Sequence, residues 1–216
     1  MKISQYFLYS GIAVWTFEEL CDELKKGIES SLERRGLKGV ENSEFRAIVI
    51  GETTASPLFV KYSAFISTEL ESHIAKMNNS GIKIERAPID PLEVLRKLQS
   101  ELRKIISVRN NLIHNSWSPQ LLSDEELAVR AFSNKISEKG RKIKVSELNE
   151  SDFKEFIRNC EMLKRTISFL NYCLDTESSL DRYFEITSGT ILPINNAEME
   201  ELSILSEIQE QIEMLA

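Results

Sequence analysis

The strongest constraint on the fold is a helical pattern of apolar residues in the middle of the chain. Between residues 90 and 117, leucine and isoleucine recur in a rhythm of threes and fours, at Leu95, Leu98, Leu102, Ile105 and Leu112. This spacing is typical of an amphipathic helix whose apolar stripe is buried against other helices. Because Asp90 and Pro91 form a favoured helix start, we expect a helix over residues 91–117, hereafter the motif helix.

One position of this stripe carries a permanent charge. Arg109 stands where the pattern requires an apolar residue, between Ile105 and Leu112. A guanidinium on a buried stripe is unfavourable unless its donors are satisfied. Because a helix turns by about 100° per residue, Asn110 and His114 then lie at the margin of the same stripe.

Two interpretations of this polar cluster are open. In the structural one, Arg109 pairs with a buried acid, for which Glu19 is the natural candidate. His114 is then a helix-end residue that the helix dipole favours. In the functional one, Arg109, Asn110 and His114 together bind or transform a ligand.

The remaining periodicity predicts an all-α protein built as a helical bundle. Further helices are expected over residues 2–35, 56–77, 151–174 and 197–215, with a short helical stretch at 180–186. Residues 37–56 are irregular, and residues 47–51 are a candidate short strand. His73, near the end of the second helix, is expected to be satisfied or solvated and not catalytic. We expect a bundle domain over residues 1–186 and an acidic helical appendage over residues 187–216.

The period changes between residues 127 and 145, where the sequence predicts a two-stranded hairpin with Gly140 at its turn. The hairpin is basic, with cationic side chains at Arg130, Lys135, Lys139, Arg141, Lys142 and Lys144. Such a ribbon is either a solvated face whose lysines discourage edge pairing or a surface that binds a polyanion.

Charge and cysteine content narrow the class of protein. The net charge is −7, but residues 175–216 hold ten acidic residues and one basic residue, so that segment carries −9 and the rest of the chain +2. Three distant cysteines lack metal-ligand spacing and are expected to be reduced core thiols of a cytoplasmic protein.

No apolar run approaches the roughly 18–20 residues that span a bilayer. We expect a soluble protein without a membrane segment.

The segment from Arg109 to His114, RNNLIH, resembles the Arg-x4-His signature of HEPN domains. In that family the signature lies near the end of a long helix in an α-helical bundle, often with a polar residue after the arginine, as Asn110 is here. The resemblance extends to the expected architecture: a long first helix containing residues 11–15, the motif helix, a small basic hairpin and a return helix. It covers roughly residues 1–174, and the acidic C-terminal helix lies outside it.

The resemblance implies a metal-independent endoribonuclease without a cofactor, acting in a toxin–antitoxin system or in anti-phage defence. RNA would be cleaved to 2′,3′-cyclic phosphate and 5′-hydroxyl ends. His114 would serve as general acid or base, Arg109 would stabilise the phosphate, and Asn110 would orient the histidine or the substrate. Because one histidine cannot be both acid and base at once, a homodimer with its motifs meeting at one cleft is expected.

RNA would be held by the basic hairpin. Arg130, Lys135, Arg141, Lys142 and Lys144 are the candidates for backbone contacts, and Trp117 either stacks on a base or packs in the core. An antitoxin or regulatory protein is a further expected partner. Two other functions stay open: a non-catalytic HEPN-like scaffold that binds nucleotide or RNA, and a helical protein-interaction module whose partner docks on the acidic C-terminal helix.

Overall fold

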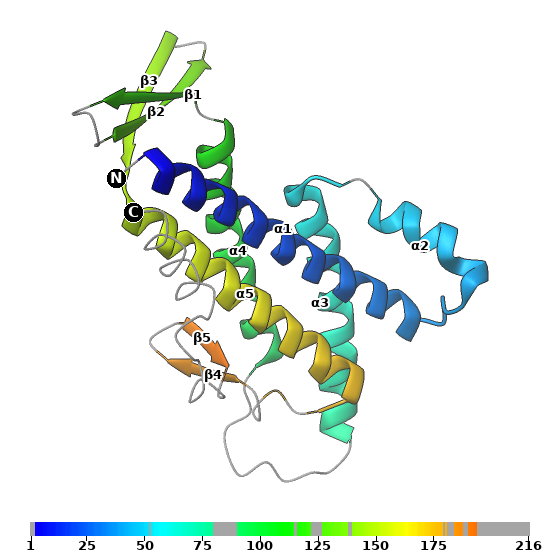
Figure 1. Ribbon diagram of the computed structural model, residues 1–216. Helices are drawn as coiled ribbons and strands as arrows, with labels where there is room; N and C mark the ends of the chain where they lie inside the picture. The colour runs from blue at the N-terminus through cyan, green and yellow to red at the C-terminus, as the bar shows by residue number, and fades with distance from the viewer. Residues whose placement is uncertain are drawn as a thin grey trace. The chain divides into compact units, whose positions relative to one another are not determined.

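The computed structural model describes residues 3–51, 53–79, 90–114, 116–121, 127–137, 140–178, 180, 184–187 and 190–193 (Figure 1). This part of the chain is mostly helical, as expected for an all-α protein. The helices are α1 (Ile3–Arg34), α2 (Ser43–Ile50), α3 (Ala55–Asn79), α4 (Pro91–His114) and α5 (Glu150–Thr176), with a short 3-10 helix, η1, at Val40–Asn42. The strands are β1 (Ser116–Leu121), β2 (Leu127–Ser137), β3 (Gly140–Leu148), β4 (Phe184–Thr187) and β5 (Thr190–Pro193).

The described residues form two compact units. Unit 1 comprises those within 1–18 and 104–161, and unit 2 comprises those within 19–103 and 162–198. The helices α1, α4 and α5 therefore contribute residues to both units. None of the helices in the described ranges is both long and apolar enough to cross a membrane.

The core of unit 2 is formed by apolar stripes on four helices. Each stripe follows the spacing of threes and fours, so its side chains share one face of a helix. The buried residues include Leu24, Ile28 and Leu32 of α1; Leu58, Ile66 and Leu70 of α3; Leu95, Leu98 and Leu102 of α4; and Leu163, Ile167 and Leu170 of α5. Full burial of such a side chain is worth about 1.5–3 kcal/mol.

A close approach of three helices lies within this core. A Cβ atom on Gly27 of α1 would stand 2.5 Å from Tyr62 Cε2 of α3 and 2.7 Å from Asn171 Nδ2 of α5. Real Cβ atoms do not come that near, so the helix requires glycine here despite its low helix propensity.

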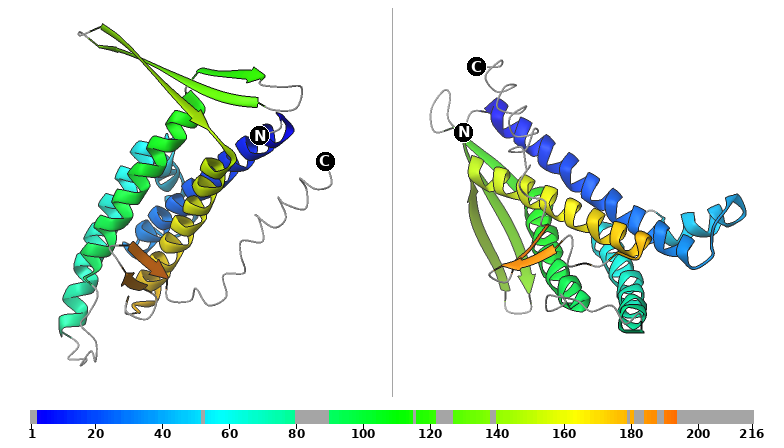
Figure 2. Two further views of the ribbon diagram at one scale, coloured as in Figure 1. Left: turned by 90° about the vertical axis from the view of Figure 1, so that its left-hand side faces the viewer. Right: turned by 90° about the horizontal axis from the view of Figure 1, so that it is seen from below.

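Unit 1 combines aromatic helix packing with a small sheet. The Phe17 ring of α1 stacks on Phe156 of α5 at 6.3 Å between centroids, and the Tyr9 and Phe153 rings stack at the same distance. The three strands have the order β1-β2-β3 and are antiparallel. Figure 2 shows β2 and β3 as a long twisted pair that leads into α5.

The motif helix is shorter than predicted. It ends at His114, so Trp117 lies in β1, opposite Ala131 of β2. Pro119 explains the difference, because the residue before a proline is biased toward extended backbone and proline is tolerated in an edge strand. The strand β1 was not predicted. Where the sequence predicts a hairpin over 127–145, β2 and β3 pair from Val129↔Leu148 to Ser137↔Gly140.

Two further predictions were wrong. Residues 47–50, a candidate strand, belong to α2, because a short apolar run does not distinguish a strand from a helix. Residues 184–186, predicted to be helical, form β4 together with Thr187, and β4 pairs with β5. Their β-branched residues flank Ser188-Gly189, which favours a tight hairpin. The predicted helix over 197–215 lies outside the described residues.

The helix α2 is attached through polar contacts. None of its residues is buried. Arg46 donates a hydrogen bond of 2.7 Å to the carbonyl of Leu37, and Lys61 of α3 donates one of 2.7 Å to the carbonyl of Val49. Phe45 and Ile48 are exposed to solvent.

The cysteines Cys21, Cys160 and Cys173 are buried and carry free thiols. Burial raises the pKa of the Cys173 thiol to about 12. A protonated, enclosed thiol is unreactive, in agreement with the expectation of reduced core thiols.

Candidate functional site

The site is built around Arg109, five residues before the end of α4. Its side chain is half-buried, and Cζ lies 5.4 Å from the centroid of the Phe17 ring. Its Nη1 donates a hydrogen bond of 3.4 Å to Oδ1 of the neighbouring Asn110. A guanidinium over an aromatic face is attracted by the ring quadrupole and is only weakly hydrated, so the cation is held in a partly apolar setting.

A small pocket adjoins the guanidinium. Arg109 lines it together with Tyr6, Ser10, Ala13 and Val14 of α1 and with Phe153 and Phe156 of α5, all in unit 1. The Tyr6 ring stands edge-on to Phe153 at 5.9 Å. The cavity measures about 40 Å³, close to the volume of one water molecule. A nucleotide does not fit inside it, so a phosphate that reaches Arg109 must approach from the protein surface.

The residues that follow Arg109 lie at the end of the helix. Asn110 and Asn111 are exposed. His114 is the last residue of α4, and its side chain lies outside the described residues. The unsatisfied carbonyl groups of a helix C-terminus favour positive charge, which suits an imidazole that must hold a proton for part of a reaction cycle.

The predicted RNA-binding residues all belong to the strands β1–β3. Trp117 is in β1, Arg130 and Lys135 are in β2, and Arg141, Lys142 and Lys144 are in β3. Their side chains lie outside the described residues. In the backbone register Lys135 pairs directly with Lys142, whereas Arg130 pairs with Glu147. Directly paired positions, and positions two apart on a strand, share a face of the sheet. The three lysines therefore hold positions on one face.

Glu19, the predicted acid partner of Arg109, accepts a hydrogen bond of 2.7 Å from Lys164 of α5. Both side chains are partly exposed, and both residues belong to unit 2. The Glu19 carboxylate thus has a partner that the sequence did not indicate, and its contact with Arg109 stays a prediction.

Sequence reasoning missed the residues that surround Arg109. The helical spacing of Tyr6, Ala13 and Phe17 predicts an apolar face of the first helix but does not link that face to the motif. Ser10 was not singled out. The available signal was that the aromatic residues of this face, Tyr6 and Phe17, lie toward the N-terminal end of the first helix. Spacing shows which residues share a face, but it does not show what that face contacts.

No metal centre accompanies this arrangement in the described ranges, where no three His, Cys, Asp or Glu side chains gather closely enough to hold an ion. Comparison of the chain with protein-family models, curated proteins and solved structures finds no match.

Proposed function

We propose that this chain is a metal-independent endoribonuclease of the HEPN type, cleaving RNA to 2′,3′-cyclic phosphate and 5′-hydroxyl ends in a toxin–antitoxin or anti-phage defence role. The observation that carries the proposal is the setting of Arg109, a cation held half-buried over the Phe17 ring at 5.4 Å beside the exposed Asn110. His114 follows at the last residue of α4. The proposal includes a HEPN-like bundle whose basic hairpin follows the motif helix.

The reaction needs a proton acceptor, a proton donor and a cation. The 2′-hydroxyl of RNA loses its proton as its oxygen bonds to the adjacent phosphorus, the P–O5′ bond breaks, and the leaving oxygen takes up a proton. His114 carries a proton in this exchange, a role worth about 10²–10⁴ in rate. Arg109 binds the phosphate and stabilises the charge that builds up on it. Packing on Phe17 supports this role because it restricts the guanidinium before the substrate arrives.

A second copy of the chain supplies the second imidazole. Unit 1 offers a surface for it, since Phe7, Val14 and Trp15 of α1 are 68%, 43% and 52% exposed. Exposed large apolar side chains that gather on one element mark an interaction surface. Val14 also lines the pocket beside Arg109, so a copy that covers this surface comes close to the motif.

The strands supply the attraction for RNA. Lys135 and Lys142 hold directly paired positions, and like charges at such positions destabilise a sheet. A bound phosphate backbone relieves that repulsion. The expected interaction is electrostatic, salt-dependent and nearly independent of base sequence.

One observation favours a second candidate, a protein-interaction module without catalysis. Apolar side chains are exposed on α1 and also on α2, where Phe45 and Ile48 are 50% and 77% exposed. A partner protein that covers these residues would explain them without any chemistry at Arg109. RNA cleavage decides between the two functions.

The test is cleavage of single-stranded RNA by the purified chain in the presence of EDTA. Arg109→Ala and His114→Ala are expected to abolish cleavage without loss of helical content. Arg103→Ala is the matched control, because it removes an arginine stacked on Phe59 at 6.0 Å elsewhere on α4. The proposal fails if both motif variants cut RNA as fast as the parent chain or if EDTA stops cleavage.

A further inference from the structure

A second pocket lies within unit 2, where α1 and α5 end beside the last turns of α3. It measures about 300 Å³, at the lower end of the range for small-molecule sites. The side chains of Arg34, Arg35, His73 and Lys76 line it together with Glu69 and Glu177. No pattern in the sequence indicates this pocket.

The imidazole of His73 is buried in the wall of this pocket. The residue is only 8% exposed, and nothing within the described part of the chain forms a hydrogen bond with its ring. The ring nitrogens of His73 are not among the fully buried, unpaired polar atoms of the described residues, so they reach the open space of the pocket. There the ring can donate a hydrogen bond to a ligand. Burial lowers the pKa of His73, which leaves a neutral ring with one N–H donor at pH 7.

The charged side chains around the pocket differ in how many partners they have and in how exposed their ion pairs are. Glu69 is neutralised by Arg34, which also pairs with Asp175, and it accepts a hydrogen bond from Ser31. Lys76 pairs only with Glu177 among the ion pairs of the described residues, and these two side chains are 62% and 64% exposed. Solvent-exposed pairs of this kind contribute little to stability. Lys76 can therefore exchange Glu177 for another anion.

Glu177 occupies an unusual backbone position. It has a φ of 53°, the left-handed region that disfavours residues with a side chain. It follows α5, where the Ser178 amide donates a hydrogen bond of 3.0 Å to the carbonyl of Cys173. The carboxylate at this position pairs with Lys76 at the pocket.

The charge of the ligand follows from the two groups that it would contact, the N–H donor of His73 and the ammonium group of Lys76. Around them Arg34, Arg35 and Lys76 are balanced by Glu69, Glu177 and the Asp175 that pairs with Arg34, and the C-terminal carbonyl groups of α1 and α5 oppose an additional anion. An anion is therefore favoured only where it takes the place of the Glu177 carboxylate beside Lys76. We infer that this pocket binds a small oxyanion of the phosphate type, which accepts hydrogen bonds from His73 and Lys76 and displaces the carboxylate of Glu177. The inference does not depend on the ribonuclease activity.

The test is proton NMR of the imidazole rings, because the chain has only two histidines. His114→Gln leaves one imidazole signal and so assigns both. Titration with inorganic phosphate, with sodium chloride holding the ionic strength constant, is expected to shift the His73 signal saturably. The same titration with adenosine monophosphate identifies the source of the phosphate. Tighter binding indicates a nucleotide, and equal binding indicates recognition of the phosphate group alone.

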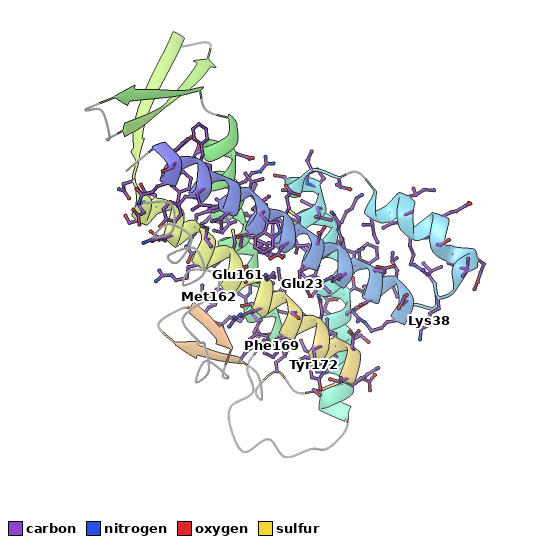
Figure 3. The ribbon with its side chains drawn as sticks, in the orientation of Figure 1. Glu23, Lys38, Glu161, Met162, Phe169 and Tyr172 are labelled. Atoms are coloured by element: carbon purple, nitrogen blue, oxygen red, sulfur yellow. The ribbon has the colours of Figure 1, made fainter. Side chains whose placement is uncertain are left out.

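Three variants test whether the phosphate binds at this pocket. Lys76→Ala is expected to weaken phosphate binding about tenfold, the loss of one charge-assisted hydrogen bond. Glu177→Gln is expected to tighten it. Lys38→Ala is the control, because Lys38 follows the end of α1, is exposed and is not part of the pocket (Figure 3).

The inference is overturned if His73 shows no saturable shift, or if Lys76→Ala binds phosphate as the parent does. A shift confined to His114 also overturns it, since the phosphate then binds at the proposed catalytic site. Loss of RNA cleavage in the Arg109 variants leaves this test unaffected, so the two proposals fail separately.

Discussion

The hydroxyl group of Tyr62 on α3 donates a hydrogen bond of 3.2 Å to Oδ1 of Asn171 on α5. Burial raises the pKa of this tyrosine, so the phenol remains a donor throughout the range in which the protein is handled. Both side chains close around Gly27 of α1. This contact fixes the spacing of three helices in unit 2.

Gly27→Ala is therefore expected to destabilise the protein. The added methyl group would overpack Tyr62 and Asn171, which costs about 1–3 kcal/mol and exceeds the gain of about 1 kcal/mol that alanine brings to a helix. Gly11→Ala on the same helix is the control, because its Cβ meets nothing within 4 Å, and it is expected to stabilise. Urea unfolding measures both. Equal effects of the two substitutions would contradict the close approach.

Arg109→Lys is expected to lower the rate of RNA cleavage by about 10²-fold or more. Lysine keeps the charge but lacks the planar fork that contacts two phosphate oxygens, and loss of one such donor costs about 10²–10³ in rate. Arg103→Lys on the same helix is expected to keep the parent rate. If the two variants cleave equally well, Arg109 does not contact the phosphate.

Charge reversal at Lys142 and Lys144 is expected to weaken RNA binding and to flatten its salt dependence. If each lysine neutralises one phosphate of a single strand, the slope of log K against log salt falls by about 1.4. The control reverses Lys25 and Lys26, which form helical ion pairs with Asp22 and Glu23. Fluorescence anisotropy with labelled RNA measures the slopes. An unchanged slope in the strand variant would limit these lysines to a structural role.

The stability of the protein is expected to fall as the pH drops below about 6.5. The pKa of His73 in the folded state is below its ordinary value of 6.5, so the unfolded chain binds more protons in this range. The neutral His73 ring contributes fully to the stability of the fold above the pKa that this histidine has in the unfolded chain. The contribution is lost as the pH falls toward the pKa of His73 in the folded state. His73→Gln should reduce this loss, whereas His114→Gln should retain it. Urea unfolding at pH 7.5 and pH 5.5 measures both, and equal losses in both variants would contradict the assignment.

Local patterns predicted most of the helical part of the chain. The helix expected over residues 2–35 is α1, Ile3–Arg34, and the helix expected over 151–174 lies within α5. Apolar spacing and caps act within one element, so they suffice for its start, length and buried face. They failed at Trp117 and at residues 47–50, where short stretches have no clear period and the tertiary context decides.

The sequence did not predict which residues surround Arg109 and His73. Arg109 was found because it interrupts a stripe, but its packing on Phe17 joins residues 92 positions apart. His73 sits on its helix among ordinary polar neighbours, and only the ends of α1 and α5 make it part of a pocket. Spacing indicates which face of a helix is apolar, whereas the choice of the opposing face depends on the whole chain.

The polar attachment of α2 predicts that this segment opens locally while the helical core stays folded. No residue of α2 is buried, and the contacts that hold it are polar: hydrogen bonds from Arg46 and Lys61 to backbone carbonyls and a partly exposed ion pair between Arg46 and Glu29. Little free energy therefore opposes its local opening. Within the described ranges, limited proteolysis should therefore cut first near residues 40–50, and the nicked chain should still melt with the cooperativity of the intact one.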